Sequence, residues 1–337
     1  MAEKTYDLLA VGRSCIDLYS NDIGAAFSDI TSFAAYVGGS PTNVCVAAAR
    51  LGLRTAMLTA VGPDPVGEFV VKFLAGEGVD TRFIPVKSGC RTSAVLLGIE
   101  PPDKFPMIYY RGDAADAQIS IDDVLAAPVT DSRAVLIAGT NLARDPLRSA
   151  TIYAAERARS AGATVVLVLD LRADQWHDLR AFGVAARSVL RSIDILIGTA
   201  DELKAAMLTE DMKVSVEHSQ VSEAHVSGDL ALAVASALDS GIQALIMTRG
   251  RQGAAVYTRN APSIEAPPYP VDILNTLGAG DAFAAGLLYG RLKGWDWRRS
   301  ARMGNACGAI VVTRHGCSKF MPYEQEALDF VAGRGGF

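Results

Sequence analysis

The sequence lacks any apolar run long enough to span a membrane, and its longest apolar segments are strand-sized, as from Ala163 to Leu169. The first residues lead into such a segment without the apolar core or cleavage site of a secretion signal. The five cysteines are odd in number and scattered, which suits reduced thiols better than a disulfide framework. Lysine and arginine are dispersed and the net charge is −5. We therefore expect a cytoplasmic protein that binds neither membranes nor nucleic acid.

Three familiar phosphate-binding signatures are also missing. The chain has no Gly-x-x-x-x-Gly-Lys-Ser/Thr sequence, which excludes the P-loop NTPases. The loop from Gly12 to Asp17 lacks the three-glycine spacing of a dinucleotide fingerprint. The His-Arg-Asp and Asp-Phe-Gly elements of protein kinases are absent as well. Phosphate recognition in this chain must therefore use another loop.

Short buried-strand patterns alternate with amphipathic helices along most of the chain. This alternation predicts a three-layer α/β fold with a mostly parallel sheet, in one domain over residues 1–337. The expected strands are Asp7 to Gly12, Thr55 to Val61, Arg133 to Ile137, Thr164 to Leu169, Ile193 to Ile197 and Ala244 to Thr248. Capping residues predict helix starts at Ser40, Asp64, Asp145 and Asp229. From Leu277 onward the pattern is almost wholly helical and predicts helices at Ala279 to Lys293, Asp296 to Val312 and Tyr323 to Val331.

Two regions, about 16–37 and 82–112, break this alternation. They contain short alternating stretches without helical periodicity, which predict extra strands that form a small β lid over the site. The apolar or aromatic residues of the lid suit a homodimer interface, and they suit equally the underside of a lid that closes on a substrate. These residues are Phe33, Tyr36, Met107 and Tyr109.

The segment from Leu274 to Phe283 combines small residues with a single carboxylate at an expected helix start. Gly278, Ala279 and Gly280 leave backbone N–H groups open to an anion, which the positive end of the helix also attracts. Asp281 follows directly, and an acid beside an anion site is suited to take a proton from a hydroxyl that attacks phosphorus. The alternative is a plain glycine-rich turn whose aspartate is favoured by the helix dipole.

Three motifs in order resemble those of the ribokinase or PfkB family of carbohydrate kinases. They are Val37 to Ala47 around two glycines, Thr248 to Gly253, and Asn275 to Asp281. The likeness extends from about Asp7 to Met321. It implies a ribokinase-like α/β/α sandwich, ATP and Mg²⁺ as cofactors, and transfer of the γ-phosphoryl group to a sugar hydroxyl.

Within the family the chain is most similar to the kinases of 5-dehydro-2-deoxygluconate, a sugar acid of inositol catabolism. That subgroup commonly contains Leu-Asn-x-Leu-Gly-Ala-Gly-Asp, which Leu274 to Asp281 reproduces. Other acceptors stay open: 2-keto-3-deoxygluconate, fructose, ribose or a nucleoside. A non-catalytic sugar sensor is a further alternative, against which the intact Asp281 argues. The other segments that carry the resemblance are Gly12 to Leu18, Tyr36 to Pro41, Tyr110 to Asp116, Ile197 to Glu202 and Val311 to Cys317.

The resemblance also implies roles at the acceptor side. Asp281 would be the general base, and the N–H groups from Leu277 to Gly280 would form an anion hole. Positions that hold substrate hydroxyls in the family are matched by Asp17, Gly39 and Asn43.

Two arginines are the candidates for binding an acceptor carboxylate. Arg111 suits a bidentate contact, although a surface pairing with Asp113 or Asp116 explains it equally well. Arg172 lies in a segment, Leu169 to Trp176, that resembles an element of sugar-acid kinases but is two residues short.

On the nucleotide side, the resemblance assigns the phosphate and ribose end to Thr248, Gly250 and Gly253, and places Asn305 near the base. Glu202 matches an acid that influences Mg²⁺ through water, but Thr199 replaces the asparagine of that element.

Two further positions depart from the family pattern. Asn275 replaces an aspartate that in some members helps to hold a monovalent cation, so activation by K⁺ is left open. The polar insert at 213–226, with His218 and His225, is expected to be a solvated loop and not a metal site.

Overall fold

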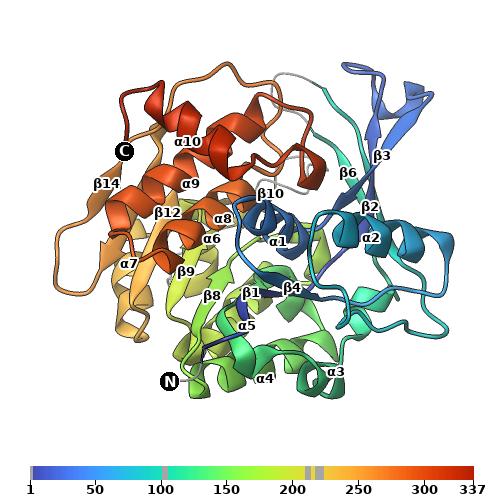
Figure 1. Cartoon of the computed structure of the whole chain (residues 1–337), viewed down its shortest axis with the longest axis horizontal. Helices are drawn as coiled ribbons and strands as arrows, with labels where there is room; N and C mark the ends of the chain where they lie inside the picture. Colours follow the sequence, from blue (N-terminus) through green and yellow to red (C-terminus); the bar gives the residue numbers. More distant parts are fainter. Residues whose placement is uncertain (1–2, 101–104, 209–213, 217–223) are drawn as a thin grey trace.

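The computed structural model describes residues 3–100, 105–208, 214–216 and 224–337. Most of its strands form one central sheet, and a second, smaller sheet stands beside it (Figure 1). The strands of the central sheet are β1 (Tyr6–Val11), β4 (Thr55–Leu58), β7 (Ser132–Ala138), β8 (Thr164–Val168), β9 (Ile195–Gly198), β12 (Ala244–Thr248), β13 (Ala254–Thr258) and β14 (Ile264–Ala266). Those of the smaller sheet are β2 (Cys15–Ser20), β3 (Phe33–Gly38), β5 (Ser93–Leu97) and β6 (Met107–Tyr110), and a separate pair joins β10 (Val214–Val216) to β11 (Ala224–Val226).

Helices flank the central sheet on both faces, and in Figure 1 α8 to α10 lie on the side opposite α3 to α5. The helices are α1 (Ser40–Arg50), α2 (Pro65–Gly76), α3 (Ile121–Ala126), α4 (Leu147–Ser160), α5 (Leu179–Val189), α6 (Ala200–Met207), α7 (Leu230–Asp239), α8 (Ala279–Leu292), α9 (Trp297–Val312) and α10 (Glu324–Ala332). Among the described residues, no helix combines the length and apolar character that a membrane crossing requires.

The central sheet runs in the order β14-β13-β12-β9-β8-β7-β1-β4. Its strands are parallel from β12 to β4, and only β13 and β14 pair antiparallel at one edge. The prediction of a three-layer fold with a mostly parallel sheet is confirmed. The antiparallel edge was not predicted.

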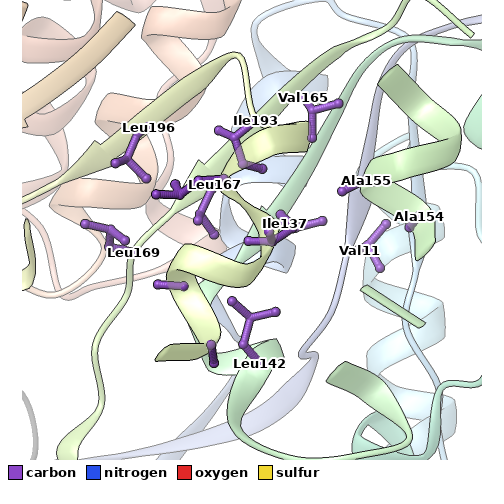
Figure 2. Packing of buried hydrophobic residues seen from close by; sticks show 14 of the residues in the cluster. Val11, Ile137, Leu142, Ala154, Ala155, Val165, Leu167, Leu169, Ile193 and Leu196 are labelled. Carbon is purple, nitrogen blue, oxygen red and sulfur yellow. The ribbon is translucent and has the colours of Figure 1, made fainter. Parts of the chain in front are cut away.

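Alternation along the strands divides the core into two layers. Leu8, Leu136 and Val166 pack with α1, α8 and α9, whereas their sequence neighbours face the opposite layer. Figure 2 shows that layer, which includes side chains of β7, β8 and β9 and, beside β1, those of α4. Both faces are therefore apolar, and polar side chains collect where the strands end. The labelled residues of Figure 2 are Val11, Ile137, Leu142, Ala154, Ala155, Val165, Leu167, Leu169, Ile193 and Leu196.

The predicted lid is confirmed as the smaller sheet, in the order β3-β2-β5-β6. The β2 strand pairs antiparallel with β3 and parallel with β5, and β6 completes the sheet against β5. In Figure 1 these strands extend away from the central sheet at one end of the molecule.

The helix starts differ from the prediction at two of four places. Asp64 and Asp229 cap α2 and α7 as expected, through bonds to backbone N–H groups of the first turn. Ser40 instead lies inside α1, whose cap is Gly39, and its hydroxyl is therefore free for a tertiary contact. The helix after Asp145 begins only at Leu147, with Pro146 as its cap.

The polar insert at 213–226 lies partly outside the described residues, and His218 is among those outside. His225 lies in β11 with an exposed side chain, and its Nδ1 is 3.9 Å from Asp201 Oδ2.

Candidate active site

One pocket collects residues from segments far apart in the chain: the loop after β1, the lid, the starts of α1 and α8, and the loop after β8. Parallel strands and helix starts converge at this end of the sheet, which is where α/β folds place ligands. Of the residues predicted from the sequence, the pocket is lined by Asp17, Gly39, Asn43, Arg172, Gly278 and Asp281.

Asp281 lies in the first turn of α8, half-buried, with both carboxylate oxygens held. Ser40 Oγ donates to Oδ1 at 2.6 Å, and Asn43 Nδ2 donates to Oδ2 at 2.7 Å. Burial raises the pKa of Asp281 to about 6, the charge of Asp170 adds to that rise, and the two hydrogen bonds oppose it. The group can therefore exchange a proton near neutral pH.

The backbone before Asp281 presents free donors to the pocket. Gly278 caps α8 with φ +80°, a left-handed conformation that glycine tolerates. The N–H of Leu277 donates to Asn275 Oδ1 at 2.9 Å and that of Ala279 to Thr276 O at 3.3 Å. Within the described chain, no intramolecular acceptor meets the N–H groups of Gly278 and Gly280. These two are the donors best placed for an anion.

Asn275 uses both ends of its amide within the protein. Its Oδ1 accepts from Leu277, and its Nδ2 donates to His315 O at 2.9 Å. The side chain is buried, with 1% of its surface exposed. Asn275 thus ties the turn before α8 to the loop after α9 by direct hydrogen bonds.

Asp17 lies on β2 and is buried against the two glycines before α1. A Cβ built on Gly38 would lie 1.8 Å from Asp17 Oδ2, and one on Gly39 would lie 2.4 Å from Arg13 O. Burial raises the pKa of Asp17, whereas the charge of Arg13 lowers it. Gly38 therefore leaves the space that the carboxylate of Asp17 occupies.

Arg172 reaches the same pocket from the loop after β8. Its Nε donates to Asp170 Oδ1 at 2.9 Å, and Asp170 Oδ2 accepts from Thr140 Oγ1 at 3.2 Å. Asp170 has φ +37°, an unfavourable conformation for a residue with a Cβ. The loop is thus held in a specific shape with the guanidinium of Arg172 in the pocket.

Arg111 lines a neighbouring pocket, which shares Tyr109 with the first. Its Nε donates to Asp116 Oδ2 at 2.7 Å and its Nη1 to Gln175 Oε1 at 2.7 Å. Only 8% of Arg111 is exposed, so the pairing with Asp116 is buried and not at the surface. The structure therefore does not bring Arg111 together with Asp281.

The turn after β12 holds three of the predicted nucleotide residues. Thr248 ends the strand, and Gly250 and Gly253 have φ +53° and +81°. A Cβ on Gly253 would lie 2.3 Å from Ala266 O, so this position accepts no side chain without displacement of β14. Asn305, on α9, donates to Ala266 O at 2.9 Å.

Glu202 is held by backbone N–H groups at the start of α6. Its Oε2 accepts from Thr199 at 2.8 Å and its Oε1 from Leu171 at 2.9 Å. Burial raises its pKa. The described residues contain no group of three or more His, Cys, Asp or Glu that could hold a metal ion. A single held carboxylate fits a magnesium ion that arrives with phosphate ligands and keeps its waters.

Comparison with known proteins identifies the family. The model of the pfkB family of carbohydrate kinases matches residues 6–324. The chain belongs to the pfkB family. It is a carbohydrate kinase, which transfers a phosphoryl group to an alcohol group.

Relatives of this pfkB kinase cover nearly its whole length. A 5-dehydro-2-deoxygluconokinase of Geobacillus thermodenitrificans is 31% identical over 330 residues, which are 98% of this chain and 94% of the relative. An E. coli structure in complex with ATP and Mg²⁺ has a TM-score of 0.84 at 23% identity, with 97% of this chain and 99% of that chain covered. A fructokinase double mutant of Vibrio cholerae, bound to fructose, ADP and a potassium ion, has a TM-score of 0.82 at 23% identity, with 98% and 99% covered.

The lid residues of the kinase divide between its two faces. Met107 and Tyr109 line the pocket, and the ring of Tyr36 packs against Tyr19 at 5.4 Å. Ile108 and Tyr110 are the exposed apolar residues of β6. These contacts place much of the apolar lid surface over the pocket, and a homodimer through the lid stays a prediction.

Sequence reasoning missed three residues of the pocket region. Ser40 was interpreted as a helix cap, but its hydroxyl bonds to Asp281. Asp170 and Arg13 lie inside two of the segments considered above but were assigned no role; the first holds Arg172 and the second lines the pocket. Arg13 could have been found from the sequence, because it is a charged residue that follows a buried strand directly after Gly12.

Proposed function

We propose that this kinase transfers the γ-phosphoryl group of ATP to a hydroxyl of 5-dehydro-2-deoxygluconate, a sugar acid of inositol catabolism. Similarity to 5-dehydro-2-deoxygluconokinases over nearly the whole chain supports this acceptor. The guanidinium of Arg172 in the pocket supports an anionic acceptor. A structural neighbour in complex with ATP and Mg²⁺ supports ATP as the donor.

The observation that carries the proposal is the placement of Asp281. Its carboxylate is fixed by Ser40 and Asn43 beside the free N–H groups of Gly278 and Gly280. In the proposed step Asp281 takes the proton of the acceptor hydroxyl as the new O–P bond forms and the bond between the γ-phosphorus and ADP breaks. The free N–H groups stabilise the charge on the transferring phosphoryl group.

The remaining pocket residues position the acceptor. Asp17 and the backbone at Gly39 lie beside Asp281 in the same pocket and would bind sugar hydroxyls. Asn43 serves Asp281 directly through its 2.7 Å hydrogen bond. Its own Oδ1 lies 2.7 Å from Ser318 Oγ, which fixes the orientation of the amide.

Nucleotide and metal binding are proposed for the end of the sheet near β12. Thr248, Gly250 and Gly253 would contact the phosphates and ribose, and Asn305 would lie near the base. Glu202 would act on Mg²⁺ through bound water, and the ion would neutralise phosphate charge.

A panel of acceptors tests the proposal. The purified protein is mixed with Mg-ATP and, separately, 5-dehydro-2-deoxygluconate, 2-keto-3-deoxygluconate, fructose, ribose and a nucleoside, and ADP release is followed. We expect the highest kcat/KM with 5-dehydro-2-deoxygluconate. A higher value with one of the neutral acceptors would reject the sugar-acid proposal, and phosphorylated product must appear in proportion to ADP.

A further inference from the structure

Arg13 is a buried cation that the described protein does not pair. It follows β1 in the loop that leads to β2, and only 5% of its surface is exposed. Its Nε and Nη1 atoms are buried and have no hydrogen-bond partner. Burial lowers the pKa of Arg13, but the nearby charges of Asp170 and Asp17 help to offset this, and the guanidinium stays protonated. What the group lacks is acceptors for its buried N–H groups, and each unsatisfied donor costs about 1–3 kcal/mol. The cost indicates that a group outside the chain completes this site.

Neither of the nearby carboxylates, Asp17 and Asp170, accepts a hydrogen bond from Arg13, although both attract its charge. Asp17 shares the pocket and accepts from Cys15 Sγ at 3.1 Å, while Asp170 is bound to Arg172 and Thr140. Arg13 forms no ion pair with a carboxylate of the described residues. Arg13 instead makes a cation–π contact with an aromatic ring, in which the guanidinium carbon lies 5.0 Å from the centroid of Tyr109. Stacking fixes the plane of the guanidinium and leaves its edge open to a ligand.

Other buried arginines of the chain show the contrast. Arg302 is 8% exposed and stacks on Tyr269 at 3.8 Å, but its nitrogens also donate to three backbone carbonyls. Arg111 is paired with Asp116. Arg13 has the stacking contact without the hydrogen bonds, so a structural role alone does not account for it.

We infer that Arg13 determines specificity for the acceptor: together with Arg172 it binds the carboxylate of the sugar acid. This inference rests on the sugar-acid acceptor proposed above. A planar carboxylate matches the forked donors of a guanidinium. Both arginines line the pocket of Asp281, and Arg172 is already paired with Asp170 at 2.9 Å, whereas Arg13 has buried N–H groups without an acceptor. The carboxylate of a sugar acid supplies a charged acceptor for the unused N–H groups of Arg13, and a neutral sugar does not.

Two acceptors and two variants test the inference. The acceptors are the sugar acid and its neutral counterpart, in which a hydroxymethyl group replaces the carboxylate. In Arg13→Met we expect kcat/KM to fall by about 10²- to 10³-fold for the acid, as for loss of one partner of a buried charge pair, and to change little for the neutral sugar. Arg302→Met is the matched control, because it removes a stacked, buried arginine without changing the preference for the acid.

Thermal unfolding without ligands gives a readout independent of turnover. Arg13→Met should unfold at a temperature close to that of the unmodified protein, since no hydrogen bond of Arg13 to the described protein is lost. Arg302→Met should unfold at a lower temperature, since three hydrogen bonds are lost. The sugar acid should raise the unfolding temperature of the unmodified protein and have a smaller effect on Arg13→Met. Arg13→Lys keeps the charge without the fork and should lose only part of the selectivity.

Failure of the inference on Arg13 and failure of the proposed function give different results. Equal losses for acid and neutral acceptors in Arg13→Met, or a variant that does not fold, would make Arg13 a structural residue and overturn the inference while the sugar-acid kinase stands. If the unmodified protein prefers the neutral acceptor, the proposed function fails and the inference fails with it.

Discussion

The acceptor pocket and the turn after β12 are built by different means. In the pocket, side chains from distant segments hold one another, as Ser40 and Asn43 hold Asp281. In the turn, glycine backbones set the shape, and Gly253 has no room for a Cβ. If the proposed function is correct, chemistry and acceptor choice depend on side-chain charge in the pocket, whereas nucleotide binding depends on backbone shape in the turn.

The largest expected effect is at Asp281. Asp281→Asn keeps the size of the side chain but removes the proposed base, so we expect kcat to fall by about 10²- to 10⁴-fold or more. Initial rates of ADP release with saturating substrates measure this. The unfolding temperature should stay close to that of the unmodified protein, which separates chemistry from folding. Full activity in the variant would place the base elsewhere.

Two glycine substitutions test whether backbone shape determines the stability and function of the turn after β12. Gly253→Ala should lower the free energy of unfolding by about 3 kcal/mol, because its Cβ meets the backbone of β14, and should raise KM for ATP. Gly250→Ala meets open space and bears only the strain of a positive φ, about 1 kcal/mol. Urea unfolding and ATP titrations compare the pair. Equal effects in both variants would contradict the steric explanation.

The pH dependence of kcat/KM for the acceptor should be determined by Asp281 in the acceptor pocket. Asp281 must be deprotonated to accept a proton, so kcat/KM for the acceptor should fall as the pH drops through about 6. Ser40→Ala removes a hydrogen bond that lowers this pKa, so the midpoint should move to higher pH. A midpoint that stays unchanged in Ser40→Ala would show that another group titrates.

The smallest expected effect concerns monovalent cations. Asn275 ties its loop directly through both amide atoms, so we expect activity to be the same in K⁺ and in a large organic cation at equal ionic strength. A fructokinase neighbour binds potassium. Strong activation by K⁺ would contradict this expectation, and Asn275→Asp provides the variant in which a carboxylate could attract the ion.

The layered fold could be predicted from the sequence because apolar periodicity reports burial on both faces of a parallel sheet. The edge strands β13 and β14 were missed, since short strands beside a glycine turn carry little periodicity. The start of α1 was misplaced because Ser40 is a common cap, and only its distant contact with Asp281 shows another use.

Part of the candidate site could be predicted from the sequence. The motifs predicted that Asp17, Asn43 and Asp281 belong to one site, and all three line the same pocket. Motifs did not separate Arg111 from Arg172, because only the folded chain shows that Arg172 lines the pocket of Asp281 and Arg111 a neighbouring one. The unpaired state of Arg13 is a property of three-dimensional packing and has no sequence signal of its own.

The space shared by Asp17 and Gly38 has a consequence for how the two positions can change. A side chain at 38 and a carboxylate at 17 would occupy the same volume, with only 1.8 Å between Cβ and Oδ2. Substitutions at the two positions are therefore not additive: alanine at 38 should be costly beside Asp17 and well tolerated beside a glycine at 17. The two residues, on neighbouring strands of the lid, are therefore coupled through the volume that they share.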